Sequence, residues 1–323
     1  MISEYMEHRV NSLTESGILS AVTVLMALIG VYVPFLGLVA ILLWPLPITV
    51  LVVRHGFRWG VMAAVVASVL IAVIIEPTVA VRLALAFAPV GLALGYGYRL
   101  GWSGIRLVTA AIIVSVLAKG IALMMVFFLT GIHPFSGQLE MLRESYTQAA
   151  EMYKGMGMNE VQIEMAKQSF EHNLGVIEIL LPLVVVTMGL LDTMVNFIVA
   201  GKVFKRLGME VPVLPPFREW RLPQAFAWLF GASLVAAYIG HANEIPILFQ
   251  AGMNGYMAAT LAGLVEGVVV FEYAMAHYNW SRWASTIFLI MIFMNGLLFQ
   301  ILAIAGILDT VFDYRKKFFG AER

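Results

Sequence analysis

The sequence predicts an all-α protein, a polytopic bundle of eight or nine transmembrane helices. Hydrophobic residues make up 61% of the 323 residues and charged residues only 12%, whereas roughly a quarter of the residues in an average soluble domain are charged. In addition, apolar runs of about 20 residues, the length that a helix needs to cross a bilayer, fill the chain almost from end to end. Only residues 133–174 form a sizeable polar stretch.

The apolar runs follow one another closely. Pro34 separates the first two spans within a run that is too long for one helix, and Pro45 with Pro47 is expected to kink the second span. We expect spans near residues 17–33, 36–53, 57–75, 79–98, 105–130, 175–200, 223–240, 250–276 and 282–308.

Loop charges indicate how these spans are organised and oriented. The basic residues of the short loops fall on one side, which is the cytoplasmic side by the positive-inside rule; the N-terminus is then cytoplasmic. Nine spans would place the basic tail outside, so either one of the last three segments is re-entrant or the tail breaks the rule. The regions are spans one to five (1–132), a polar hairpin (133–174), the sixth span (175–200), a basic, proline-rich loop (201–222) and C-terminal helices with a basic tail (223–323).

The polar stretch 133–174 predicts an acidic helical hairpin outside the cytoplasm. Apolar residues recur at helical spacing over 139–153, and Asn159 with Gln162 is typical of an N-cap and capping box at the start of a second helix. The simplest interpretation is that the apolar stripe packs on the embedded helices. The alternative is a lid or a dock for a protein partner, for which several methionines would give an adaptable surface.

Three charged residues lie inside apolar runs, where an ionised group costs about 2.5–3.5 kcal/mol at mid-depth unless it has a partner. Lys119 matches Glu266 better in depth, but its long side chain could also reach Asp192, so both pairings are compatible with the sequence. The charges would form either an ion pair that fixes helix packing or a polar wall of a substrate or proton pathway. Glu76 and Arg82 are expected to form a solvated pair, and Arg82 is the best single cation to meet an anionic solute arriving from outside.

Several function classes lack their motifs. The sequence has no GxxxxGKS or GxxxxGKT, no HExxH and no GxSxG, and it has no cysteine. The balanced charge, 20 basic against 20 acidic residues, gives no indication of a nucleic-acid partner. We therefore expect a non-enzyme without a cofactor. His133, His172 and His241 with Glu178 and Glu244 could gather near the outer face, but they lack diagnostic metal-ligand spacing, and no metal site is predicted.

One internal similarity joins two distant helix ends. The run Gly189-Leu-Leu-Asp-Thr-Met-Val-Asn-Phe197 resembles Gly306-Ile-Leu-Asp-Thr-Val-Phe-Asp-Tyr314, and both precede basic residues. Chance similarity between membrane helix ends is the simpler explanation. A true repeat would place both ends on the cytoplasmic face and would favour a re-entrant segment among the last three.

Particular sequences connect the chain to known families. Leu46-Pro-Ile48, Pro215-Pro-Phe-Arg-Glu-Trp-Arg-Leu-Pro223 and the closing Gly306–Lys316 stretch resemble the YybS-like family of bacterial membrane proteins, a domain of unknown function. The resemblance implies a multi-pass protein of the bacterial cytoplasmic membrane. The first six spans also resemble, more weakly, the substrate-binding S-components of energy-coupling-factor transporters, on the proline-rich second span, Gly56 to Gly60, and Gly91-Leu-Ala-Leu-Gly95.

Two functional hypotheses follow. In the first, the protein captures a small solute from outside at the outer half of spans three to six, under the hairpin, and partner proteins supply energy. The candidate substrate-binding residues are Arg82, Lys119, Asp192 and Glu266. In the second, it is a non-catalytic scaffold, similar to shape-determining proteins of the MreD type, that engages cell-envelope proteins through residues 133–174 and 201–222. A polar cavity of roughly 300 Å³ open to the outer face would favour the first hypothesis. A dry core with exposed apolar hairpin surface would favour the second.

Overall fold

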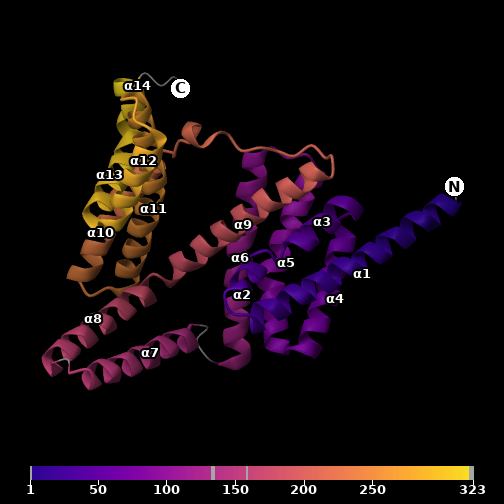
Figure 1. Ribbon diagram of the computed structural model, residues 1–323, viewed down its shortest axis with the longest axis horizontal. Helices are drawn as coiled ribbons and strands as arrows, with labels where there is room; N and C mark the ends of the chain where they lie inside the picture. The colour runs from indigo at the N-terminus through magenta and orange to yellow at the C-terminus, as the bar shows by residue number, and fades with distance from the viewer. Residues whose placement is uncertain (1, 132–134, 158, 320–323) are drawn as a thin grey trace. The chain divides into compact units, whose positions relative to one another are not determined.

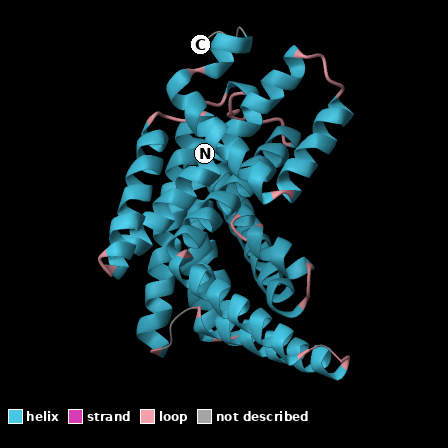
Figure 2. Ribbon diagram, turned by 90° about the vertical axis from the view of Figure 1, so that its left-hand side faces the viewer, coloured by secondary structure: helices cyan, strands magenta, loops and turns pink. Residues whose placement is uncertain are grey.

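Most of the described part of the chain is helical, and the longest non-helical stretch lies between residues 206 and 225. A computed structural model describes residues 2–131, 135–157 and 159–319, and no described residue lies in a strand (Figures 1 and 2). The predicted all-α class is confirmed. The helices are α1 (Ile2–Tyr32), α2 (Leu36–Leu42), α3 (Leu46–His55), α4 (Phe57–Ile74), α5 (Pro77–Arg99), α6 (Gly104–Thr130), α7 (Ser136–Gly155), α8 (Glu160–Ile179), α9 (Leu181–Arg206), the 3-10 turn η1 (Phe217–Glu219), α10 (Ala225–Ala242), α11 (Pro246–His277), α12 (Arg282–Met294), α13 (Gly296–Phe312) and α14 (Tyr314–Phe319).

Within the described residues, eight segments are long and apolar enough to cross a membrane, and the bent pair α12–α13 makes a ninth if it is counted as one span. The sixth span differs from the prediction: it is α9, over 181–206 rather than 175–200, because α8 continues to Ile179 and Pro182 opens a new helix after the break. The first span is also longer than predicted, covering 12–32.

The chain forms two compact units, the first made of residues 1–168 and 184–214 and the second of 169–183 and 215–323. In the first unit, α3 lies against α5 because two glycines remove the side chains that would hold them apart. A Cβ at Gly91 would lie 2.6 Å from the Pro45 carbonyl oxygen, and one at Gly95 would lie 2.9 Å from that of Thr49. The second span, in which Pro45 and Pro47 were expected to cause a kink, is broken by a turn at residues 43–45, between α2 and α3.

In the second unit, α10 and α11 are antiparallel and pack at glycines. Gly240, near the end of α10, contacts Phe249 near the start of α11. Helix α13 crosses α11 where Gly306 lies directly on the backbone of Gly263. Because any side chain at these positions would meet backbone atoms, the glycines set the closeness of the three helices.

The direction of α13 determines where the tail lies in this unit. The Tyr256 hydroxyl accepts a hydrogen bond from Gln300 Nε2 (2.8 Å), and further along both helices Gly263 of α11 lies against Ile307 of α13. Helices α11 and α13 are therefore parallel. Since α10 is antiparallel to α11, α13 ends on the face where α10 begins, and the 108° bend between α12 and α13 returns the chain to that face (Figure 1). This is the geometry of the re-entrant alternative.

The polar stretch forms the expected pair of helices, α7 and α8. Asn159 caps α8 by accepting a hydrogen bond from the Val161 N–H (3.0 Å). Lys154 and Glu160 form an exposed ion pair of 2.8 Å, and this hydrogen bond raises the pKa of Lys154 and lowers that of Glu160. The apolar stripe is only partly covered: its residue Leu139 is buried, Tyr146 and Ala149 are half-buried, and Leu142 and Tyr153 are exposed. Within this stripe only Leu139 is buried, and its packing on the embedded helices stays a prediction.

Candidate functional site

Lys119 lies midway along α6 with its side chain buried in the first unit. Its ammonium group donates to Asp192 Oδ2 (2.5 Å), to Ser115 Oγ (2.9 Å) and to the Ala86 carbonyl oxygen (3.4 Å). The ammonium nitrogen also lies 4.6 Å from the centre of the Phe87 ring. All three N–H groups therefore have acceptors. Of the two pairings that the sequence allowed, the structure contains the one with Asp192.

Asp192 links the ion pair to the interrupted second span. One of its carboxylate oxygens pairs with Lys119, and the other accepts a hydrogen bond from Ser115 Oγ (3.0 Å). One turn further along α9, Asn196 donates to the Asp192 carbonyl oxygen and to that of Leu42, each at 2.8 Å. Leu42 is the last residue of α2. Helix α9 is thus tied to the place where the second span breaks.

Three fully buried polar atoms beside this network have no hydrogen-bond partner among the described residues. They are Trp44 Nε1, Thr193 Oγ1 and Asn196 Oδ1. The Trp44 ring packs against Phe87, with ring centres 6.5 Å apart, and Phe87 is the ring that faces Lys119. Each unsatisfied buried polar group costs about 1–3 kcal/mol. A small polar molecule that supplied the missing bonds would remove that cost.

Arg82 lies on α5, one helical turn before Ala86, and is exposed. The predicted solvated pair with Glu76 is not formed in the structure, where the Glu76 carboxylate accepts a hydrogen bond from the Thr78 hydroxyl. Within the described parts of the chain, no carboxylate lies in ion-pair range of Arg82. Four residues correspond to about 6 Å along a helix axis. Arg82 is therefore an exposed cation near the Lys119 network but not part of it.

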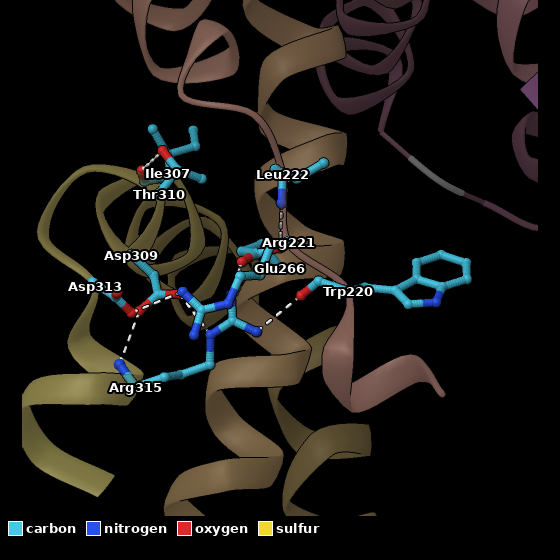
Figure 3. Close-up of polar contacts among 9 residues, drawn as sticks. All are labelled: Trp220, Arg221, Leu222, Glu266, Ile307, Asp309, Thr310, Asp313 and Arg315. Carbon is cyan, nitrogen blue, oxygen red and sulfur yellow. Dashed lines mark hydrogen bonds and ion pairs between the residues drawn. The ribbon is translucent and has the colours of Figure 1, made fainter. Parts of the chain in front are cut away.

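Glu266 belongs to a different cluster, in the second unit, around the buried Arg315 (Figure 3). Arg315 Nε donates to Asp309 Oδ2 (2.7 Å), Nη1 donates to the Trp220 carbonyl oxygen (2.9 Å), and Nη2 pairs with Glu266 Oε1. The second oxygen of Glu266 accepts from the Leu222 backbone N–H (3.0 Å). Of the two pairings left open by the sequence, the one between Lys119 and Glu266 is not formed, because Glu266 pairs with Arg315 from the C-terminal tail.

This cluster fastens the 220–222 segment and the start of α14 to α11. Arg221 adds an ion pair with Asp313 (2.9 Å), the residue with positive φ that ends α13. The four carboxylate oxygens of Glu266 and Asp309 all accept hydrogen bonds from Arg315 or Leu222. Because each of these oxygens already has a donor from the protein, we assign the cluster a structural role.

The sequence interpretation missed Arg315 as a buried residue because it stood in a basic tail. The similarity between the runs 189–197 and 306–314 could have indicated this cluster. Asp192 and Asp309 occupy matching positions in the two runs, and each is buried and paired with a cation. Ser115 and Asn196 were also missed, since neutral polar residues in apolar runs are common.

The possible metal set does not assemble among the residues that the structure describes, where no group of three histidine or acidic side chains is placed to hold an ion. His133 lies outside those residues.

A cavity of about 200 Å³ lies in the first unit, between α5, the end of α9 and residues 211–214. Its wall is mostly apolar and includes Lys202 and Lys205. It is thus not the polar outer cavity that the solute-binding hypothesis predicts, because it lies at the basic end of α9.

Comparisons with known proteins cover nearly the whole chain. The model of a family described as "Predicted membrane protein (DUF2232)" matches residues 21–310. The chain is 24% identical over 306 residues to the uncharacterized protein YybS of Bacillus subtilis (strain 168), an alignment that covers 95% of this chain and 98% of that protein. No solved structure matches. The similarity to energy-coupling-factor S-components stays a prediction.

Proposed function

The chain belongs to this family of multi-pass membrane proteins, and from that premise we propose that its first unit binds a small polar solute beside the Lys119–Asp192 pair. In this proposal the protein is a non-catalytic, transport-related subunit of the bacterial cytoplasmic membrane, with its basic loops on the cytoplasmic side. Other proteins would supply the energy for movement of the solute.

One observation carries the proposal: three fully buried polar atoms without partners adjoin a buried ion pair at an interrupted helix. Interrupted helices near mid-membrane are where many transporters bind their substrates, because the break frees backbone groups for a ligand. Trp44 Nε1 offers a donor, Asn196 Oδ1 an acceptor and Thr193 Oγ1 either. Such a set suits a neutral polar solute with both donor and acceptor groups.

The proposed roles follow from the contacts. Lys119 and Asp192 satisfy one another, so they position the site and keep it polar rather than bind the solute directly. Arg82, exposed one turn from Ala86, would meet the solute before it enters. Glu266 has no role in binding, since the Arg315 cluster uses both of its oxygens.

Thr193→Val tests this proposal with little disturbance, because it removes a hydroxyl that has no protein partner. Wild-type protein would be purified from native membranes, and its bound small molecules would be profiled by mass spectrometry. We expect one polar solute enriched on wild-type protein and depleted at least tenfold on Thr193→Val. Thr260→Val is the matched control, since the Thr260 hydroxyl donates to the Tyr256 carbonyl oxygen in the second unit. Equal profiles for all three proteins would contradict solute binding.

A scaffold role is the second candidate, and one observation favours it: the acidic hairpin exposes large apolar side chains, among them Met141, Met152, Val161 and Met165. Exposed apolar surface outside the bilayer is typical of a protein-binding site. Met141→Glu with Met165→Glu would then remove a co-purifying envelope protein, while Thr193→Val would retain it. If the hairpin variant retained every partner, the scaffold hypothesis would lose its support.

A further inference from the structure

The cavity at the end of α9 is preformed by aromatic contacts. The Tyr98 hydroxyl donates to the Phe197 carbonyl oxygen (2.8 Å), and the Tyr98 ring stacks on Phe197 and meets Phe204 edge-on, with ring centres 5.8 and 5.0 Å apart. These contacts hold the ring in one place. Gly201 then leaves the cavity open, since a Cβ there would meet only the Tyr98 hydroxyl, at 3.5 Å.

Two cationic residues, Lys202 and Lys205, are among the residues that line this apolar cavity. Lys202 and Lys205 are three residues apart on α9, so they share one helix face. Both are exposed, and no carboxylate in the described residues lies within ion-pair range of either. Arg54, at another span end in the same unit, is by contrast paired with Glu15 at 2.7 Å. Lysines at a helix C-terminus complement the helix dipole, but that effect does not explain an open apolar cavity beside them.

The position of the cavity identifies the kind of ligand. It lies at the end of a membrane span, where lipid headgroups meet water, and its residues change from apolar to basic over the last two turns of α9. At about 200 Å³ it is smaller than the usual 300–1,000 Å³ of a drug-sized ligand site. It has room for part of an acyl chain, and the lysines are placed to meet the phosphate of the same molecule.

We propose that this is a binding site for an anionic phospholipid, with its phosphate between Lys202 and Lys205 and part of one acyl chain in the cavity. Basic pockets between membrane helices are suited to anionic headgroups, and each lysine near a charged surface strengthens binding about fivefold. Removing both lysines would therefore weaken binding about 25-fold. The site is separate from the proposed solute site and stands whether or not a solute binds.

The test uses the full chain in neutral detergent with phosphatidylglycerol, phosphatidylcholine, glycerol phosphate or inorganic phosphate added. Thermal unfolding would be followed by intrinsic fluorescence. We expect phosphatidylglycerol alone to raise the Tm of wild-type protein, and the lipid concentration needed to rise about 25-fold for Lys202→Met/Lys205→Met. Gly201→Leu keeps both lysines and fills the cavity, so it should also lose the phosphatidylglycerol effect.

Lys316→Met/Lys317→Met is the matched control, because it removes the same charge from a different helix, α14. It should respond to phosphatidylglycerol as wild-type protein does. The proposal is wrong if both lipids stabilise the protein equally, if the Lys202/Lys205 variant keeps the selective response, or if inorganic phosphate reproduces it. An unchanged response in Gly201→Leu would overturn the assignment of the acyl chain to the cavity.

Discussion

Replacing Lys119 with methionine removes the cation of a buried pair and leaves its partner behind. In this variant Asp192, 1% exposed, would keep only the Ser115 hydroxyl as a side-chain donor. Removing one partner of a buried ion pair typically costs about 3–5 kcal/mol, because the remaining charge is buried without compensation. We therefore expect Lys119→Met to lower the free energy of unfolding by about that amount.

Removing the entire network gives the opposite expectation. The triple variant Lys119→Met, Ser115→Ala and Asp192→Leu leaves no charge and no unpaired hydroxyl at these three positions. Apolar replacement of a buried ion pair is neutral or stabilises a protein by about 1–4 kcal/mol. The free energy of unfolding of the triple variant should therefore equal or exceed that of wild-type protein. Reversible denaturant unfolding in mixed micelles measures both variants, with Lys154→Met as a control at an exposed pair. If Lys119→Met were as stable as wild-type protein, the network described here would be refuted.

Three further predictions concern stability and topology. Thr193→Val removes an unpaired buried hydroxyl, so the free energy of unfolding should stay the same or rise by as much as about 1–3 kcal/mol. If chemical unfolding showed a loss of stability instead, the hydroxyl would have a partner in the protein. Gly306→Ala should lower the stability of the protein by about 1–3 kcal/mol or more, because the added Cβ would meet the backbone of α11. Gly296→Ala is the control: its Cβ would lie in open space, so this variant should melt near the wild-type temperature. Because the chain has no cysteine, the single variants Lys316→Cys and Asn243→Cys can each be labelled with an impermeant thiol reagent. The two cysteines should react from opposite sides of the membrane. Reaction of both from the same side would contradict a re-entrant α12–α13 pair.

The fold class and most spans could be predicted from sequence, because the length and apolar content of a membrane helix are fixed by the bilayer itself. Errors occurred where that signal is weak. The boundary between α8 and α9 falls within an apolar stretch, and only Pro182 marks it. Apolar content alone also cannot distinguish a crossing helix from the re-entrant pair, since both are apolar along their length.

The candidate site was predictable in part. Lys119 and Asp192 stood out as charges inside apolar runs, and the structure pairs them. Their pairing could not be decided from depth, because the true partner of Glu266, Arg315, lies in a tail that reads as a loop. The unpaired atoms of Trp44 and Thr193 could not be predicted at all, since they depend on which side chains pack around them rather than on residue type.

The most direct test of solute binding is a high-resolution experimental density map of the protein purified from native membranes into lipid nanodiscs. We expect non-protein density, larger than that of water molecules, within hydrogen-bond distance of Trp44 Nε1 and Asn196 Oδ1, at a level half-way between the two ends of α9. Thr193→Val should weaken that density without moving the Lys119–Asp192 pair. Solute binding at this site would be contradicted if protein atoms filled this space and Trp44, Thr193 and Asn196 bonded to one another, or if water alone occupied it.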